Sequence, residues 1–435
     1  MSQGTPGVAQ TQRLLRRIDQ AINKDDVALA LNLALSNFAQ FVDTAQLRER
    51  IATALALRGR GRAAAKIYAL VARHYANAGF PTRALATIKQ MGLVQPDTSV
   101  ELDYLSSLYH VRSTHLSDAA SRREVSIPSG ALDMNGALSS ITEAQLIEEA
   151  QAQALTPEGI QQAPGSLPPI PFLSMLPLDI LRRTMELIDY EMFVEGQHIL
   201  TPEDYSTDLI WSVSPDLLLR DKDRHMRVPE NSLLGLNGFG RPRMPTQYGV
   251  QAPQGAHIIR LSAKSIRQLN TAVPDFANRV ATLRRHALTE RLLNTHPLFV
   301  RLTEDDRLAI AARFVGMHIP SGERVLSQAR PSTGLYILLD GQADVVRKDD
   351  DWEITIATLR AGDMFGEIGL VSDAAASADV HTTSACTALY LSRQSFNQAA
   401  AEFPALAQYA ANLASERIAA QNEQLSAEDL AQIEE

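Results

Sequence analysis

Residues 297–341 read PLFVRLTEDDRLAIAARFVGMHIPSGERVLSQARPSTGLYILLDG, and residues 171–215 read PFLSMLPLDILRRTMELIDYEMFVEGQHILTPEDYSTDLIWSVSP. The two stretches align without a gap at a separation of 126 residues. Their shared positions are turn and core residues: Pro171 and Pro297, Leu176 and Leu302, Gly196 and Gly322, Ser206-Thr207 and Ser332-Thr333, and Leu209 and Leu335. Further along, VQAPQGAHIIRLS from Val250 matches VHTTSACTALYLS from Val380, at an offset of 130 that Pro274 and Pro404 keep. Such constant offsets indicate a duplicated domain.

Both copies show the same order of predicted elements. A helical segment comes first, over 178–188 in one copy and 303–314 in the other, and short alternating runs bounded by Gly, Pro and Asp follow. In the second copy YILLDGQADVV, WEITIATL and TALYLS predict strands, KDDD predicts a hairpin turn, and helices are predicted over 395–403 and 404–424. We therefore expect an α+β multidomain chain with two β-roll or jelly-roll domains flanked by helices, at 169–290 and 291–424.

The composition is that of a globular protein, with 45% hydrophobic and 21% charged residues among 435. There is no apolar run of 18 residues and no signal-peptide layout, so we expect no membrane association and a cytoplasmic location. Cys386 is the single cysteine, which excludes an intramolecular disulfide, and its place in a predicted strand indicates a core residue. The ten histidines form no metal-binding pair, and no Walker loop or G-x-S-x-G motif occurs, so we expect neither a metal site nor an enzyme.

The net charge of −9 argues against general nucleic-acid binding. Residues 1–113 nevertheless carry 14 Lys and Arg against 8 Asp and Glu, including the basic cluster Arg58, Arg60, Arg62 and Lys66. This cluster keeps a nucleic-acid contact open as a minor alternative to an inter-helix loop.

Residues 10–113 predict helices, because apolar side chains recur there at helical spacing. The segment from Lys66 to Pro96 resembles a tetratricopeptide repeat, through Tyr68, Val71, Ala72, Tyr75, Gly79, Ala84, Ile88, Met91 and Pro96. Such helix pairs need a neighbour to bury their faces, so we expect a helical-repeat module that binds a protein partner. A generic helical bundle is the alternative.

Residues 114–168 predict a flexible linker, because Ser, Ala, Gly and Pro dominate it. One short helix is expected within it, where Thr142 caps the start and Gln145 reaches back. Residues 425–435 predict a frayed acidic tail.

The second copy also contains AGDMFGEIGL at residues 361–370. With Pro297-Leu298-Phe299, Gly322-Glu323, Leu335-Tyr336-Ile337 and Asp340-Gly341, this ordered set resembles the cyclic nucleotide-binding domain family over about residues 296–420. The resemblance implies a ligand site at Phe365, Gly366, Glu367, Ile368, Gly369, Leu370, Ala376 and Ser377. In that family Gly366 would let the ligand approach the backbone and Glu367 would accept a hydrogen bond from a ribose 2′-hydroxyl.

The resemblance fails at the residue that should bind phosphate. The family places an arginine nine residues after the glutamate, and this chain has Ala376 there, with Asp373 and Asp379 nearby. Three interpretations remain open: a ligand without an anionic phosphate, such as a nucleoside; an empty scaffold; or a cyclic nucleotide held by another cation, for which Arg330, Arg347 and Arg360 are candidates.

The first copy has diverged further. Gly235 is kept, but Leu236 replaces the glutamate, and Arg241 and Arg243 come too early. The NGFGRPR loop is either an anion-binding nest or, as we prefer, a plain glycine-rich turn. Trp211 is in register with Ile337 and is expected in the barrel core, so we expect no ligand in this copy.

Together these features predict a non-enzymatic sensor or adaptor. In the family that the second copy resembles, the C-terminal helix acts as a lid, and Tyr409 and Leu413 are the expected lid contacts. The alternatives are a ligand-free interaction scaffold and a transcription regulator without a C-terminal helix-turn-helix. The sequence leaves the oligomeric state open.

Overall fold

A computed structural model gives the structure of the chain. It describes residues 6–433 except 118–119, 121–127, 129, 139–140, 171–172, 203–206, 215–216, 222–223, 229, 231, 236–247, 274–275, 277–279, 281, 283–284, 286–287, 290–291, 294–295, 301, 350–351 and 373–374. The chain divides into two compact units, Met1–Arg279 and Val280–Glu435. Leu288 and Leu292 lie in the core of the second unit, which therefore begins before the predicted boundary at residue 291.

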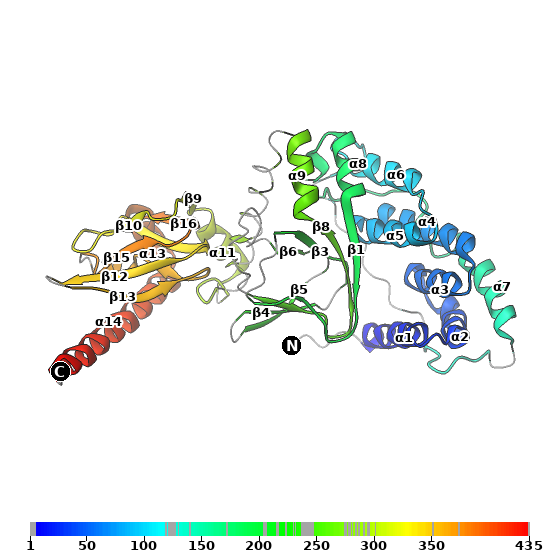
Figure 1. Ribbon diagram of the computed structural model, residues 1–435, viewed down its shortest axis with the longest axis horizontal. Coiled ribbons are helices and arrows are strands. Elements are labelled where there is room, and N and C mark those ends of the chain that lie inside the picture. The colour runs from blue at the N-terminus through cyan, green and yellow to red at the C-terminus, as the bar shows by residue number, and fades with distance from the viewer. Residues whose placement is uncertain are drawn as a thin grey trace. The chain divides into compact units, whose positions relative to one another are not determined.

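The first unit opens with six α-helices and a short 3₁₀ turn (Figure 1). They are α1 (Pro6–Asn23), α2 (Val27–Asn37), η1 (Phe38–Gln40), α3 (Ala45–Leu57), α4 (Gly61–Asn77), α5 (Pro81–Val94) and α6 (Ser99–Tyr109). Asp26 caps α2 through Leu29 N, and Gly59 and Gly79 adopt positive φ just beyond α3 and α4. The pair α4 and α5 lies where the tetratricopeptide-like segment predicted two helices, and that family assignment stays a prediction.

The segment after α6 does not behave as the predicted mobile tether, wherever the structure describes it. Its helix α7 (Glu143–Ala154) has the expected capping box between Thr142 and Gln145 and packs against α2 and α3. Arg48 of α3 is fully buried and donates hydrogen bonds to the carbonyl oxygens of Ala154, Thr156 (2.8 Å) and Glu158 (2.6 Å). The linker's composition concealed this order, because its backbone carbonyls supply the contacts and these leave no trace in a side-chain pattern.

The basic cluster of the first unit is partly neutralised within the fold. Arg58 forms ion pairs with Asp25 (2.6 Å) and Glu143 (2.6 Å), and Arg60 forms one with Glu148 (3.1 Å). These contacts favour the inter-helix interpretation over a nucleic-acid contact.

The first β-roll follows in the same unit. Its elements are η2 (Leu173–Met175), α8 (Leu178–Leu187), β1 (Ile188–Phe193), β2 (His198–Leu200), β3 (Leu209–Ser212), β4 (Leu217–Asp221), β5 (Arg224–Val228), β6 (Leu233–Leu234), β7 (Gly249–Gln251), β8 (Ala256–Leu261) and α9 (Ala263–Ala272). Its sheets have the strand orders β1-β8-β3-β6 and β2-β7-β4-β5.

The second β-roll repeats this plan. Its elements are α11 (Glu304–Ala311), β9 (Val315–Ile319), β10 (Arg324–Leu326), β11 (Gly334–Asp340), β12 (Ala343–Asp349), β13 (Trp352–Leu359), β14 (Met364–Phe365), α12 (Glu367–Val371), β15 (Asp379–Thr382), β16 (Cys386–Ser392), α13 (Arg393–Glu402) and α14 (Pro404–Ile433). Its sheet orders, β9-β16-β11-β14 and β10-β15-β12-β13, are those of the first β-roll strand for strand, so the predicted fold and its duplication are confirmed.

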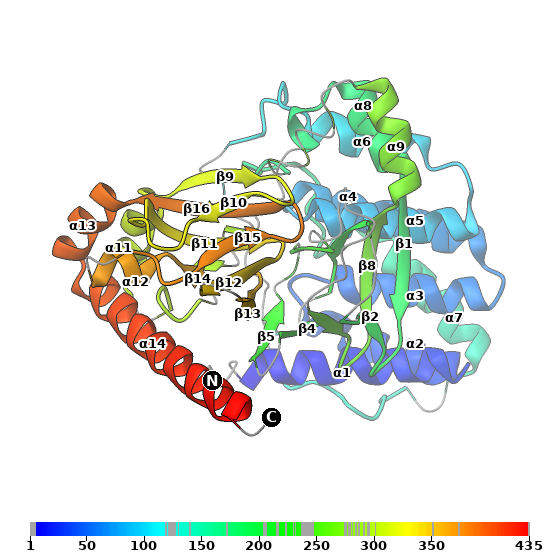
Figure 2. The ribbon, with the colours of Figure 1, turned by 60° about the vertical axis from the view of Figure 1, so that its left-hand side comes forward.

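Helix α14 is longer than predicted, since it continues to Ile433 through the expected tail (Figure 2). Residues 405–433 contain neither Gly nor Pro and are rich in Ala, Gln, Glu and Leu, which favours an uninterrupted helix.

The two faces of the β3 and β11 sheets bury different side chains. Ile210 points into the closed core of the first β-roll, so strand alternation places its neighbour Trp211 on the opposite face. Ile337, in register with Trp211, packs with helical residues such as Phe396 and Leu406. Trp211 is therefore buried as predicted, at 7% exposure, but on the face opposite Ile210 rather than inside the roll. The alternation of side chains along a strand does not tell which face of the sheet is covered by helices.

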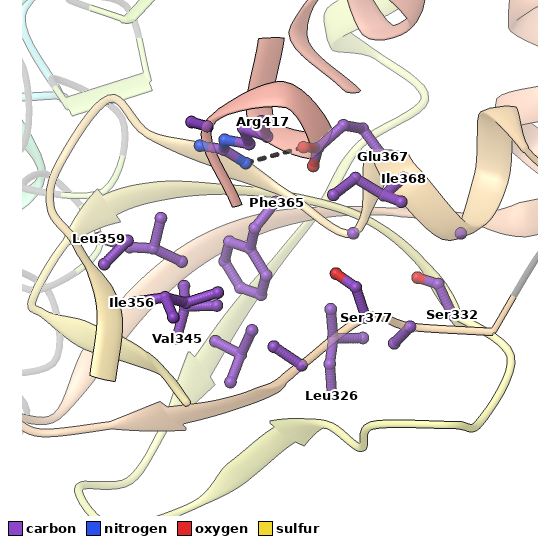
Figure 3. A pocket seen from close by; sticks show the side chains of 17 residues that line it. Leu326, Ser332, Val345, Ile356, Leu359, Phe365, Glu367, Ile368, Ser377 and Arg417 are labelled. Atoms are coloured by element: carbon purple, nitrogen blue, oxygen red, sulfur yellow. Dashed lines mark hydrogen bonds and ion pairs between the residues drawn. The ribbon is translucent and has the colours of Figure 1, made fainter. Parts of the chain in front are cut away.

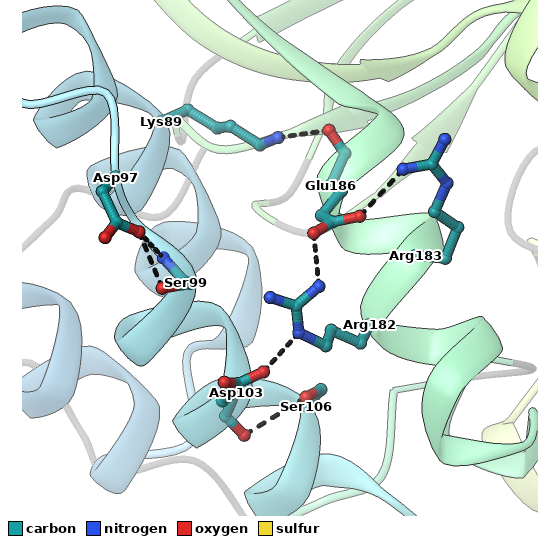
Figure 4. Close-up of polar contacts among 8 residues, drawn as sticks. All are labelled: Lys89, Asp97, Ser99, Asp103, Ser106, Arg182, Arg183 and Glu186. Carbon is teal, nitrogen blue, oxygen red and sulfur yellow. Dashed lines mark hydrogen bonds and ion pairs between the residues drawn. The ribbon is translucent and has the colours of Figure 1, made fainter.

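Polar contacts join the helices of the first unit to its β-roll. Lys89 of α5 donates to the carbonyl oxygen of Glu186 (2.8 Å), and Arg182 of α8 bonds both Glu186 and Asp103 of α6 (Figure 4). Arg83 of α5 donates two hydrogen bonds to the Glu230 carboxylate, of 2.6 and 2.7 Å.

No helix in the described part of the chain is both long enough and apolar enough to cross a membrane.

Candidate functional site

The second β-roll encloses a cavity of about 180 Å³. Its side chains come from β10, β12, β13, β14, β15, α12 and α14, and Figure 3 shows Leu326, Val345, Phe365 and Glu367 among those that converge on it. The lining residues are Leu326, Ser332, Val345, Ile356, Ala357, Leu359, Phe365, Gly366, Glu367, Ile368, Gly369, Ala376, Ser377, Ala378, Val380, Arg417 and Ala420. Most of these side chains are apolar, and Ser332, Glu367, Ser377 and Arg417 supply the polar groups. A cavity of this composition suits a flat organic ligand with a few hydrogen-bonding groups.

Gly366 lines the cavity at the start of α12. Its φ of 88° is left-handed, and a Cβ there would overlap the carbonyl oxygen of Gly334. Only glycine fits both conditions, and it starts the short helix α12, which carries Glu367 into the cavity.

Glu367 and Arg417 form the charged centre of the site. The Glu367 side chain is 1% exposed, and its Oε1 lies 2.9 Å from Arg417 Nη1 (Figure 3). The same guanidinium nitrogen donates to the carbonyl oxygen of Met364 at 2.6 Å. Because an unpaired buried carboxylate is strongly destabilised, Arg417 compensates Glu367 in this conformation and ties α14 to the cavity.

The structure gathers most of the predicted ligand residues. Phe365, Gly366, Glu367, Ile368, Gly369, Ala376 and Ser377 all line the cavity. Leu370 instead lies in the hydrophobic core between the sheet and its helices.

The predicted lid residues are also displaced. Tyr409 and Leu413 pack against that same core. The Tyr409 ring lies edge-on to the His296 ring, with 5.5 Å between the ring centroids. The residues of α14 that line the cavity are Arg417 and Ala420.

The sequence contained a signal for Arg417 that was missed. Positions 409, 413, 417 and 420 follow at spacings of four, four and three, so they share one helix face with the predicted lid contacts. Extending that face by two turns leads from the core to the cavity.

Among the residues that the structure describes, no cation takes the phosphate-binding position. Ala376 is 9% exposed; its N–H donates to Arg330 O at 2.8 Å, and its carbonyl oxygen accepts from Ala329 N at 2.9 Å. The rescue candidates Arg330, Arg347 and Arg360 do not line the cavity. Arg417 is the cation that does so among the described residues, and it is bound to Glu367.

Asp379 does not act on the cavity as expected. Its carboxylate accepts from Gln328 N (2.7 Å) and faces Arg324, Lys348 and His381. Burial raises the pKa of Asp379, but the hydrogen bonds from Gln328 and His381 and the charges of Arg324 and His381 outweigh it and hold the pKa below its usual value. Asp373 lies outside the described residues. In the described part of the chain no cluster of three His, Cys, Asp or Glu side chains is placed to hold a metal ion.

In the first β-roll Gly235 keeps the conformation of its counterpart Gly366, with φ of 75°. The predicted features Leu236, Arg241 and Arg243 lie outside the described residues.

Comparison with known proteins finds similar sequences among regulatory subunits of cAMP-dependent protein kinases. The Drosophila melanogaster cAMP-dependent protein kinase type II regulatory subunit is 31% identical over 103 residues, which are 24% of this chain and 27% of that protein. The regulatory subunit from Mycosarcoma maydis is 30% identical over 128 residues, or 29% of this chain and 24% of that protein. The chain thus spans about a quarter of the length of these relatives.

A solved structure of the regulatory domain of Toxoplasma gondii PKA with cAMP is 19% identical, covers 56% of this chain and 92% of its own, and superposes with a TM-score of 0.29. The family described as the cyclic nucleotide-binding domain matches residues 317–403. Those residues of the second β-roll belong to the cyclic nucleotide-binding domain family.

Proposed function

We propose that this chain is a non-enzymatic regulatory protein whose second β-roll binds a ribonucleoside, that is, a base and ribose without an anionic phosphate. One observation carries the proposal: the cavity keeps the buried carboxylate Glu367, Ala376 stands where the family holds phosphate, and Arg417, the cation among the described lining residues, is already paired with Glu367.

The apolar walls and the carboxylate have separate tasks. Val345, Ile356, Leu359 and Phe365 offer flat apolar contact to a base. Glu367 can accept from the ribose hydroxyls, and a hydrogen bond to a charged acceptor contributes about 1.5–3 kcal/mol.

A cyclic phosphate would be bound poorly by the same site. It would bring a negative charge beside the buried Glu367, and no free cation among the described lining residues would meet it. Losing one charge-assisted contact of about 1.5–3 kcal/mol weakens binding on the order of 10- to 100-fold.

Ligand capture also has a route to the rest of the molecule. If a ribose hydroxyl competes for the Glu367 oxygen that Arg417 now bonds, this contact weakens and so does the hold on α14, while Arg417 stays bonded to the carbonyl oxygen of Met364. Occupancy of the cavity would then alter the position of α14, which is the output of the sensor.

The helical part of the first unit is proposed to bind a protein partner. The relatives named as regulatory subunits of a protein kinase support a regulatory role, and the choice of partner is not carried over from them.

Paired ligands test the role of Glu367. Calorimetric titration of the full chain with adenosine and guanosine, each beside its 2′-deoxy form, should show ribonucleoside binding that is at least 10-fold tighter. The E367Q variant should remove most of that discrimination, because it loses the charged acceptor. Equal affinity for the ribo and deoxy forms would contradict the role of Glu367, and no binding of either would favour the ligand-free scaffold.

A further inference from the structure

We infer that Tyr248 fills, inside the first β-roll, the space that stays open as a cavity in the second, so the first β-roll holds a latent site for a small phenol. The two β-rolls can be compared residue by residue because their strands pair in the same register. Leu200 pairs with Val250 as Leu326 pairs with Val380. The strand register also shifts at the same place in both copies, between His198 and Leu200 and between Arg324 and Leu326.

A second pairing fixes the same correspondence. Leu219 pairs with Val250 across β4 and β7, as Val345 pairs with Val380 across β12 and β15. Counting back two residues from Val250 and Val380 reaches Tyr248 and Ala378.

The glycines that follow β6 and β14 correspond as well. Gly235 follows β6 and Gly366 follows β14, and both have positive φ. An added Cβ at Gly235 would meet Asp208 O at 2.8 Å, and one at Gly366 would overlap Gly334 O, the carbonyl 126 residues further on.

At this common position the side chains of the two copies differ in size. Ala378 lines the cavity of the second β-roll. Tyr248 is 3% exposed, and its hydroxyl oxygen accepts a hydrogen bond from Gly235 N at 3.2 Å.

The surroundings of Tyr248 are the counterparts of the cavity wall. Leu200, Leu219, Val228, Leu234 and Val250 share its hydrophobic core, where the second copy has Leu326, Val345, Leu359, Phe365 and Val380 along the cavity. The ring of Tyr248 thus takes the space that corresponds to the cavity, and its hydroxyl bonds Gly235. The first β-roll is kept filled by its own side chain and does not depend on a ligand.

Chemical rescue tests the inference in the full chain and does not require the second β-roll to bind anything. The Y248A variant should lower the Tm of the first unit by about 5–15 °C, because it empties a packed core. Millimolar phenol should restore about 3 °C or more to Y248A and leave the wild-type Tm unchanged. A folded Y248A protein that gains no more from phenol than the wild type would overturn the inference.

The Y248F variant keeps the test decisive if Y248A fails to fold. It retains the ring and removes the hydroxyl, so the space stays filled and phenol should give no rescue. The amide of Gly235 should exchange its hydrogen at least 5-fold faster in Y248F than in the wild type, since its acceptor is gone. Unchanged exchange at Gly235 would contradict the proposed place of the hydroxyl.

Discussion

At the scale of single residues, two side chains decide what the cavity can hold. Glu367 was predictable from sequence, because it sits in the AGDMFGEIGL motif next to a glycine that no other residue could replace. Arg417 was not predicted, because it is 50 residues further along and reaches the cavity only through the packing of α14. A motif reports residues that are close in sequence, whereas ion-pair partners are brought together by the fold.

Restoring the missing cation should change the ligand preference. In the A376R variant a guanidinium would meet a cyclic phosphate, so affinity for cyclic AMP or cyclic GMP should rise about 10- to 100-fold. Nucleoside affinity should change much less. The A376M variant, which has an unbranched and uncharged side chain, is the control and should show no such gain in calorimetry. A gain in A376M equal to that in A376R would argue against an electrostatic cause.

At the scale of elements, α14 links the cavity to the end of the chain. Its start was predicted from Pro404, but its cavity-facing residues were assigned two turns too early, since the core and the cavity lie along one helix face.

The R417Q variant should free Glu367 for the ligand and raise nucleoside affinity about 3- to 10-fold. Hydrogen exchange over 404–420 in the ligand-free protein should increase at the same time. A fall in affinity would instead mean that Arg417 contacts the ligand directly.

The linker shows a second limit of sequence patterns at this scale. Arg48 also bonds Thr44 Oγ1 (2.8 Å), and burial lowers the pKa of Arg48 to about 10 without removing its charge at neutral pH.

The R48A variant should lower the free energy of unfolding by about 3 kcal/mol or more, because it leaves buried carbonyl groups without donors. Exchange over 154–161 should accelerate. The R60A variant removes an exposed ion pair and should change the free energy of unfolding by about 0.5 kcal/mol or less.

At the scale of the whole molecule, the first unit joins helices and β-roll through a junction whose stability depends on pH. His257 of β8 bonds the Tyr190 hydroxyl through Nδ1, and burial, aided by the charge of Arg50, lowers the pKa of His257 to about 4. Between about pH 6.5 and 4 the unfolded chain binds a proton that the folded chain does not. The free energy of unfolding should therefore fall by up to about 3 kcal/mol as pH decreases through that range.

The H257N variant should lose this contribution, which denaturation at several pH values would measure as the difference from the wild type. A pH dependence identical in both proteins would exclude His257 as its source.

The duplication itself was readable in the sequence, because turns and core positions recur at constant offsets. The sequence also indicated that the first copy would hold no ligand, but it did not indicate the part that Tyr248 plays, because nothing in the sequence shows that this side chain is buried where the second copy has Ala378.

The most direct measurement is a calorimetric titration of the full chain with a nucleoside and with its own 3′,5′-cyclic phosphate, under identical buffer conditions. Guanosine and cyclic GMP, like adenosine and cyclic AMP, share base and 2′-hydroxyl and differ in the phosphate that joins the 3′ and 5′ oxygens, the group that Ala376 leaves without a partner. The nucleoside of at least one pair should bind 10-fold or more tightly than its cyclic phosphate. Tighter binding of the cyclic phosphate in either pair, lost in E367Q, would contradict the account.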